Sequence, residues 1–391
     1  MQTAASTDIA SHIEEVFKQH FHTKPLLVRS PGRVNLIGEH TDYNEGFVLP
    51  ASVDKAAYVA LTPRQDDYYN WVAADLNDTY SGKLPEIQKS DKGWPNYISG
   101  MVDQLIKAGY KIRGFDCVIG GNVPIGAGMS SSAALECAVG FALSEAFNLN
   151  ISRIDLVKLG QKVENEFVGV NSGIMDQFAS VFGKKDHVIK LDCRSLEYEY
   201  FPFKMQGIRI VLCDTGVKHS LVTSEYNTRR AQCEAGVKVL QGYYPEIKSL
   251  RDVNRARLEQ HRMEMEPVVY NRCLYVVEEN ARLLAATEDL QRADMVAFGN
   301  QMYLTHYGLR DLYEVSCPEL DYLVEFTEQE DIVLGARMMG GGFGGCTINL
   351  VKEENIEAFF SRISEAYKKD IGIDLKIYDG KIEDGTSIIK R

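Results

Sequence analysis

The chain has 391 residues, of which 45% are hydrophobic and 25% are charged, and its formal net charge at pH 7 is −12. This length and composition predict a globular protein of two or three domains with an ample hydrophobic core. The acidic balance argues against nucleic-acid binding, because contact with a phosphate backbone draws on clustered Lys and Arg. We therefore expect no nucleic-acid partner, and any anionic ligand must be held by a local site.

The sequence predicts a cytoplasmic protein without membrane contact. The N-terminal stretch MQTAASTDIASHIEE lacks a basic region followed by an apolar one, and the chain contains no apolar run of the roughly 18 residues that a membrane span requires. The eight cysteines are scattered singly without a CxxC pair. This pattern favours buried reduced thiols over disulfides or a metal site.

Hydrophobic patterning predicts an α+β fold of mixed sheets and helices. The first half shows a helix at 8–21, strands at 25–29, 34–37, 56–62 and 70–76, a helix after Pro95 and a strand at 115–121. Helical patterns follow at 131–147, 151–168 and 173–182.

Strands at 187–192 and 208–214 mark a seam between two domains, which we place at 1–195 and 196–391. The stretch 224–328 is mostly helical. The remaining patterns predict an α/β unit that closes the second domain, with strands at 347–351, 376–380 and 387–390 and a helix at 354–368.

Residues 31–46 form an unusually polar segment, PGRVNLIGEHTDYNEG. It gathers Arg33, Glu39, His40 and Asp42 between an apolar strand pattern and a glycine-bearing turn. Such a density of hydrogen-bonding side chains suits recognition of a polyol such as a sugar. Taken alone, the segment is also consistent with a solvated turn that has a charged rim.

Residues 126–136, GAGMSSSAALE, suit phosphate binding. The glycines let the backbone approach an anion closely, and the serines precede a helix whose first N–H groups are unpaired. The segment is neither a Walker loop nor a good Rossmann fingerprint, and simple helix capping is the alternative. A second glycine run at 340–345, GGGFGG, strengthens the phosphate interpretation, because a plain connector of this composition is costly in chain entropy.

Asp176 opens an apolar helical pattern at 174–179. A lone acid entering such a pattern is unfavourable unless it is paired or functional. A helix cap is the alternative explanation, and we favour a functional carboxylate.

These segments together resemble the galactokinases, a family within the GHMP superfamily of small-molecule kinases. PGRVNLIGEHTDY is close to the family signature, VPIGAGMSSSAALE to its phosphate loop and GARMMGGGFGGCTINLV to its C-terminal glycine motif. GIMDQFAS at 173–180 is a fourth match. Met129, Ser172 and Met339 depart from the common family residues without removing a charge.

The resemblance implies a two-domain GHMP kinase fold whose active site lies in the cleft between the domains. It implies transfer of the γ-phosphoryl group of ATP to the C1 hydroxyl of α-D-galactose, the entry step of galactose catabolism by the Leloir pathway. Asp176 would be the catalytic base or a positioning group, and Arg33 would keep it ionised and stabilise charge near the transferred group. Galactose would be bound by Arg33, Glu39, His40, Asp42, Gly173, Asp176 and Tyr226, with Glu39 and His40 near the C6 hydroxyl and Asp42 near C3 and C4.

The resemblance also implies an ATP site with Mg²⁺. Mg²⁺ prefers hard oxygen ligands and keeps most of its waters, so Ser132 and Glu164 suffice beside the phosphates. Glu166, two positions on, is the alternative carboxylate on another side of the same helix. ATP would be bound by Gly126, Ala127, Gly128, Met129, Ser130, Ser131 and Ser132, with Trp94, Asn96 and Tyr97 on the adenine side.

Galactose and ATP are therefore the expected partners, and we expect a monomer although the sequence carries no signal for oligomeric state. Two other functions stay open. One is a GHMP kinase for mevalonate, homoserine or N-acetylgalactosamine, and the other is a catalytically silent galactose sensor. The presence of Asp176, Arg33, Ser132 and Glu164 in one chain argues against the sensor.

Overall fold

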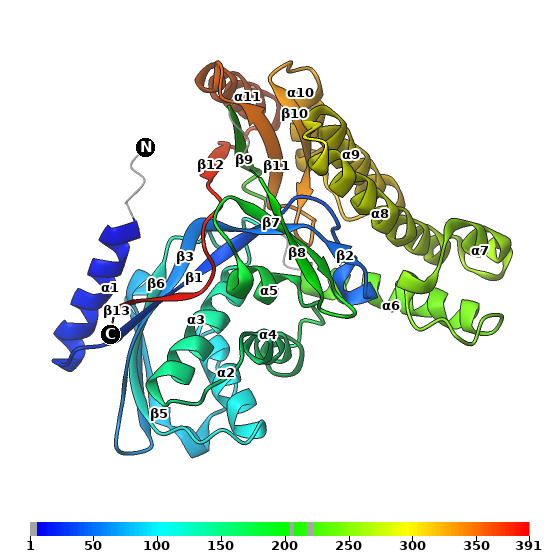
Figure 1. Cartoon of the computed structure of the whole chain (residues 1–391). Coiled ribbons are helices and arrows are strands. Elements are labelled where there is room, and N and C mark those ends of the chain that lie inside the picture. Colours follow the sequence, from blue (N-terminus) through cyan, green and yellow to red (C-terminus); the bar gives the residue numbers. More distant parts are fainter. Residues whose placement is uncertain (1–5, 204–206, 218–221, 391) are drawn as a thin grey trace.

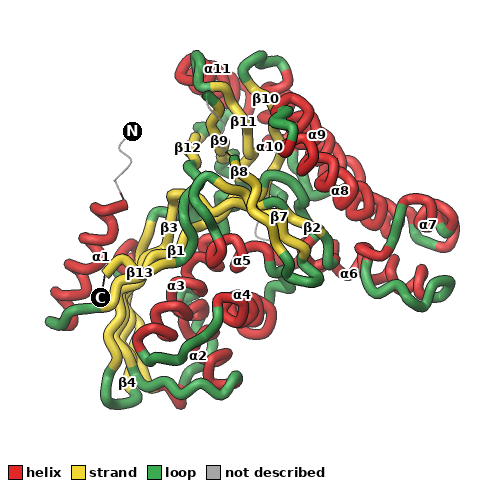
Figure 2. Tube along the Cα trace, in the orientation of Figure 1, coloured by secondary structure: helices red, strands yellow, loops and turns green. Residues whose placement is uncertain are grey.

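The computed structural model describes residues 6–203, 207–217 and 222–390, and it shows helices packed on three sheets (Figures 1 and 2). The expected α+β class with mixed sheets is confirmed. Residues 1–5, part of the N-terminal stretch discussed above, lie outside the described residues. Every helix within the described residues is too short or too polar to cross a lipid bilayer.

The largest sheet has six strands in the order β13-β1-β3-β6-β4-β5, with β4 and β6 parallel and the other neighbours antiparallel. Its faces are covered by helices on opposite sides, α1 on one and α2 and α3 on the other (Figure 1). The bounds are α1 Ser6–Phe21, β1 Leu26–Asn35, β3 Pro50–Pro63, β4 Tyr68–Ala73, β5 Asp78–Lys83, α2 Pro95–Lys107, β6 Phe115–Gly121, α3 Ser131–Ala146 and β13 Ser387–Lys390.

Side chains of β3 alternate between two cores. Tyr58 packs with Ile13 and Phe17 of α1, whereas Val59 and its neighbour two positions on pack toward α2 and α3. Successive residues of a strand point to opposite faces, so a strand buried on both faces is almost continuously apolar. This explains the unbroken hydrophobic run in the middle of β3.

The second sheet has four antiparallel strands in the order β10-β11-β9-β12. Helices α10 and α11 pack on one face, and α9 contributes Phe298 and Met302 to the core on the other. A small third sheet joins β2, β7 and β8. The bounds are β2 Phe47–Val48, β7 His187–Asp192, β8 Tyr198–Pro202, β9 Ile208–Asp214, α9 Met295–Tyr307, α10 Pro318–Glu328, β10 Val333–Met339, β11 Cys346–Lys352, α11 Ile356–Ile371 and β12 Lys376–Gly380.

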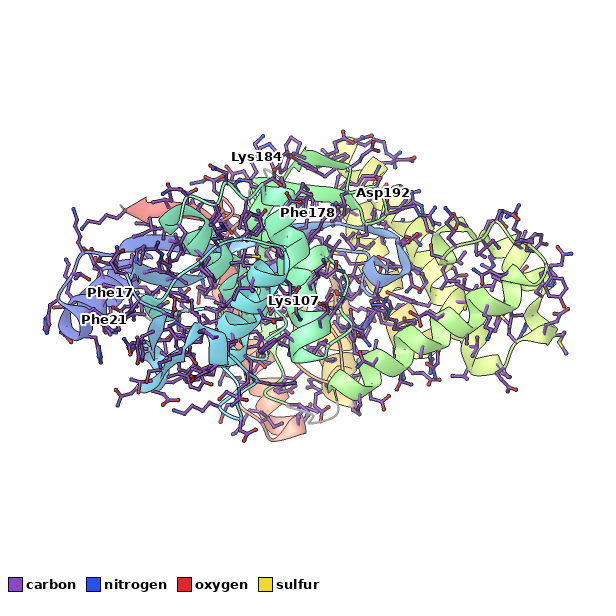
Figure 3. All side chains as sticks on the ribbon, turned by 90° about the horizontal axis from the view of Figure 1, so that it is seen from below. Phe17, Phe21, Lys107, Phe178, Lys184 and Asp192 are labelled. Atoms are coloured by element: carbon purple, nitrogen blue, oxygen red, sulfur yellow. The ribbon has the colours of Figure 1, made fainter. Side chains whose placement is uncertain are left out.

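The remaining helices complete the two halves. Helices α6 (Val222–Gln241) and α8 (Pro267–Gln291) run side by side and, with α7 (Arg255–Gln260), extend away from the sheets (Figure 1). Helices α4 (Arg153–Lys162) and α5 (Met175–Phe182) flank α3. Phe178, labelled in Figure 3, is buried. Its ring stacks on that of Phe182 with the centroids 4.4 Å apart, so the core fixes α5.

The expected strand at 387–390 forms, but its predicted place is wrong. We expected it to close the second domain, whereas β13 pairs with β1, with Val28 opposite Ile388. The hydroxyls of Ser30 and Thr386 are 2.8 Å apart beside this pairing. Pairing with β13 satisfies the backbone N–H and C=O groups at the edge of β1. The two strands come from opposite ends of the chain, so local patterning does not reveal the pairing.

Two further elements differ in extent from the predictions. The expected strands 25–29 and 34–37 form one strand, β1, with a register shift between Pro31 and Arg33. The helix expected at 151–168 ends at Lys162 and continues as a π-helical turn, η4 (Val163–Val168). The boundary at 195 falls between the paired strands β7 and β8 and stays a prediction.

Candidate active site

One cavity of about 370 Å³ brings together the polar segment, the phosphate loop and the second glycine run. A larger hollow of about 740 Å³ beside β9 and β12 contains none of these residues. Ala127 and Met129 of the phosphate loop are buried and do not line the cavity. The predicted site residues that line it are Arg33, Glu39, His40, Asp42, Tyr97, Gly126, Gly128, Ser130, Ser131, Ser132, Glu164, Asp176 and Tyr226.

Arg33 lies at the centre of the hydrogen bonding in the cavity. Its Nε donates to Oδ1 of Asp176 at 2.7 Å, and its Nη1 donates to the Gly128 carbonyl. Burial opposes the charged guanidinium, yet the carboxylates of Asp176, Glu39 and Asp42 raise the pKa of Arg33. This single side chain therefore joins β1, the phosphate loop and the start of α5.

Ser130 also contacts Asp176, a link that the sequence analysis missed. Ser130 is the N-cap residue of α3 in a left-handed conformation (φ 52°), and its side chain does not cap the helix. Its hydroxyl donates instead to Asp176. The first N–H groups of α3 therefore stay available to an anion in the cavity.

Ser132 and Glu164 lie together, as predicted for a metal site. The Ser132 hydroxyl donates to Oε1 of Glu164 at 2.7 Å, and burial raises the pKa of Glu164. Glu166 is exposed and accepts a hydrogen bond from Gln104 at 3.0 Å. The geometry therefore favours Glu164 over Glu166.

The side-chain oxygens of Ser132 and Glu164 suit Mg²⁺, which needs few protein ligands. The described residues contain no cluster of three or more His, Cys, Asp and Glu side chains placed to hold a metal ion. Mg²⁺ commonly uses one or two protein oxygens beside substrate phosphates. Near Ser132, burial and neighbouring carboxylates raise the pKa of both Glu136 and Glu164, so a cation there would be favoured.

At the other end of the cavity, hydrogen bonds orient His40. Its Nδ1 lies 2.8 Å from the Tyr43 hydroxyl, which lies 2.7 Å from the Tyr313 hydroxyl. Burial lowers the pKa of His40 to about 4, so the imidazole is neutral near pH 7. The centroid of the Tyr226 ring lies 5.2 Å from that of His40, and a neutral imidazole, with one donor and one acceptor nitrogen, suits hydroxyl recognition.

Asp42 is a carboxyl group in an apolar and acidic environment. Burial, together with Asp176 and Glu39, raises the pKa of Asp42 to about 7. The backbone N–H of Tyr43 donates to its Oδ1 at 2.9 Å. Gly173 is not among the lining residues, yet a Cβ at this position would lie 2.0 Å from Oδ2 of Asp42.

A second cavity of about 370 Å³ adjoins the first and shares Tyr97, Ile125, Ser131 and Ser132 with it. Trp94 lines this second cavity, and its Nε1 donates to Asp78 at 3.0 Å. Asn96, expected on the adenine side, instead hydrogen-bonds the backbone of Ser90. The second cavity is more apolar and suits a flat ring system.

Arg337 is a site residue that the sequence analysis missed. It lies in β10, is fully buried, and its Nη1 donates to Oε2 of Glu39 at 2.8 Å. A lone arginine inside the apolar stretch GARMM was the available signal, because a buried charge needs a partner.

The fold and these motifs define a GHMP small-molecule kinase. Profiles of the GHMP kinase N-terminal and C-terminal domains match residues 96–184 and 286–369. The galactokinase galactose-binding signature matches residues 15–63. The chain belongs to the galactokinase family, a group of ATP-dependent sugar kinases.

Curated relatives match almost the whole chain. The galactokinase of Roseiflexus sp. is 43% identical over 374 residues, which is 95% of both chains. The galactokinase of Thermotoga maritima is 43% identical and covers 93% of this chain and 100% of its own length.

Solved structures agree with this assignment. Lactococcus lactis galactokinase, solved in complex with galactose, has a TM-score of 0.93 and 37% identity, and the match covers 97% of this chain and 99% of that one. The mevalonate kinase of Methanococcus jannaschii has a TM-score of 0.64 at 20% identity, covering 92% and 99%, and shares the fold.

The contact of Gly173 with Asp42 leads to a mutational prediction. In Gly173→Ala, the new Cβ displaces the Asp42 carboxylate, so kcat/KM for galactose should fall roughly ten- to hundredfold. Steady-state kinetics in wild-type and Asp42→Ala backgrounds measure this. If the effect acts through Asp42, Gly173→Ala should cost little once Asp42 is absent, and an equal loss in both backgrounds would contradict it.

The raised pKa of Asp42 predicts a pH-dependent stability. The folded protein binds a proton at Asp42 up to pH of about 7, whereas an unfolded Asp releases it near 3.9, so this group lowers stability as pH rises between these values. Asp42→Asn should therefore raise the Tm of the ligand-free protein more at pH 7.5 than at pH 5. Calorimetry at both pH values tests this, and a pH-independent difference would refute it.

Proposed function

We propose that this protein transfers the γ-phosphoryl group of ATP to the C1 hydroxyl of α-D-galactose, giving galactose 1-phosphate and ADP. The observation that carries the proposal is a single cavity in which the galactose-signature side chains lie against the phosphate loop and Asp176. The Lactococcus lactis relative was solved with galactose bound, which supports the choice of acceptor.

In the proposed reaction, Asp176 accepts the proton of the C1 hydroxyl or aligns that hydroxyl with the γ-phosphorus. Its carboxylate is held by Arg33 and Ser130, which leaves little rotational freedom. Phosphoryl transfer passes through a loose transition state, so alignment contributes strongly beside basicity. Arg33 would also stabilise charge on the transferred group.

Glu39, His40, Asp42 and Tyr226 would orient the sugar, joined by the Gly173 backbone. Glu39 and His40 would bind the C6 end, and Asp42 the C3 and C4 hydroxyls. The neutral His40 and the partly buried Asp42 provide directional partners for hydroxyl groups. Such partners reject an epimer because it leaves them unpaired.

The ATP phosphates would lie at the N-terminus of α3. Gly126 and Gly128 have positive φ values of 81° and 73°, which bring their backbone toward the cavity, and the serines at 130–132 follow them. The helix dipole and free N–H groups favour an anion there. The adjoining cavity beside Trp94 would take the adenine ring.

We also propose Mg²⁺ at Ser132 and Glu164. Bound there, the ion would neutralise phosphate charge and help to orient the γ-phosphoryl group. The finer proposals are a cytoplasmic location, a monomeric state, two domains meeting near residue 195, and a role at the entry of galactose catabolism.

The first test of this function concerns Asp176. Purified wild-type protein should release ADP with galactose but far less with glucose or mevalonate. Asp176→Asn keeps the size of the side chain but removes its base, so kcat should fall at least ~10²-fold while galactose still binds. A coupled ADP assay and calorimetric titration of galactose measure both; near-normal kcat in the variant would remove Asp176 from catalysis.

The second test concerns the metal. Ser132→Ala and Glu164→Gln should each raise the Mg²⁺ concentration for half-maximal activity, roughly fivefold or more, because each removes an oxygen ligand or its charge from a site with few of them. Glu166→Gln is the matched control and should leave the Mg²⁺ requirement unchanged. A larger shift in the Glu166 variant would reassign the metal-side carboxylate.

A further inference from the structure

Arg337 is a fully buried arginine whose guanidinium donates four hydrogen bonds. Nε donates to the Leu36 carbonyl at 2.8 Å, Nη2 to the Asn35 carbonyl, and Nη1 to the Met338 carbonyl and to Oε2 of Glu39 at 2.8 Å. A buried charge is tolerated only when its donors are satisfied in this way. Apart from the Met338 carbonyl, its acceptors lie in one segment, residues 35–39, at the end of β1.

We propose that Arg337 is a positioning residue for sugar recognition, which locks the Glu39 carboxylate so that its second oxygen faces the sugar. This inference rests on the proposed function. Oε2 of Glu39 is occupied by Arg337 and by a long hydrogen bond from Asn35 at 3.5 Å. Among the described residues, Oε1 accepts no hydrogen bond, although Glu39 lines the cavity.

The same segment is held at two further points by the helix α8. The Tyr275 hydroxyl donates to the Glu39 carbonyl at 3.0 Å, and Oε1 of Glu279 accepts from the Gly38 N–H at 2.8 Å. Glu279 is itself buried and paired with Arg282. Both the backbone and the side chain of Glu39 are thus fixed by residues from the second half of the chain.

Fixing one carboxylate oxygen of Glu39 makes recognition of the sugar more specific. A carboxylate that is free to rotate can follow a displaced or missing hydroxyl, whereas one anchored through a charge-assisted hydrogen bond presents its other oxygen in one direction. Loss of the anchor should therefore weaken recognition of the hydroxyl that Glu39 meets, which we place at C6. The effect on the phosphate side should be small, because no hydrogen bond joins Arg337 to the phosphate loop within the part of the chain that the structure describes.

The test compares galactose with 6-deoxygalactose in Arg337→Met and Arg337→Lys. For Arg337→Met, kcat/KM with galactose should fall roughly ten- to hundredfold, mainly through KM, because the sugar hydroxyl loses an oriented partner. With 6-deoxygalactose it should fall less than about threefold, and KM for ATP should not change. Arg337→Lys should recover part of the galactose activity, since it keeps the charge but not the fork geometry.

Arg272→Met is the matched control. Arg272 is also buried and donates to a backbone carbonyl, that of Leu312, and to Glu314 at 2.6 Å, but among the described residues it makes no hydrogen bond to residues 35–39. Its loss should lower stability without changing the ratio of kcat/KM between the two sugars. An unchanged ratio in Arg337→Met as well would overturn the proposal and reduce Arg337 to a stabilising residue.

A second variant keeps the test decisive if Arg337→Met does not fold. Glu39→Gln leaves Arg337 and its backbone acceptors in place but removes the charge-assisted bond, and it should produce the same selective loss for galactose. The double variant with Arg337→Lys should then be no worse than Glu39→Gln alone. Additive losses would overturn the proposal, whereas failure of the wild-type protein to phosphorylate galactose would instead refute the proposed function.

Discussion

The site depends on one ion pair, between the buried Arg33 and the partly exposed Asp176. Arg33 lies on β1 of the large sheet, and Asp176 lies in the first turn of α5. The same guanidinium donates to the Gly128 carbonyl, and the Arg33 N–H donates to the Met129 carbonyl at 3.1 Å. Removing Asp176 would leave the buried charge of Arg33 without its ion-pair partner, which is destabilising. The acid and the phosphate loop are therefore both positioned by contacts with one residue, Arg33, which couples their positions.

Sequence reasoning found the parts of the site that are encoded locally. The glycines and serines at 126–132 predict an anion site because their chemistry depends on a helix N-terminus and on backbone conformation, both local properties. The helices and most strands follow from hydrophobic periodicity. Asp176 was recognisable as an acid that opens an apolar helix, and its partner Arg33 was assigned through the family resemblance.

The contacts that the sequence did not reveal join distant segments. Arg337 and Glu39 are 298 residues apart, and β13 pairs with β1 across about the whole chain. No local pattern distinguishes a strand that closes its own sheet from one that crosses to another. Hydrophobic periodicity also cannot decide between Glu164 and Glu166, because both lie in a π-helical turn, in which side chains point in other directions than in an α-helix. In these cases tertiary contacts decide the structure, and they override the local preferences of the sequence.

The charges in the cavity explain why bound ligands are needed to keep its acidic side chains ionised. Glu39, Asp42, Glu164 and Asp176 line it, whereas Arg33 is the one cationic side chain among its lining residues, within the part of the chain that the structure describes. Arg337 neutralises Glu39 from behind, and burial raises the pKa of Asp42 and of Glu164, so the ligand-free pocket favours protons on its unpaired acids. Hydroxyl donors at Asp42 and a cation at Glu164 would each replace a proton with a partner that favours the ionised carboxylate. The phosphate end of the pocket thus combines an anion-favouring helix N-terminus with nearby acids, and a cation bound beside Glu164 would let the two accommodate a polyphosphate together.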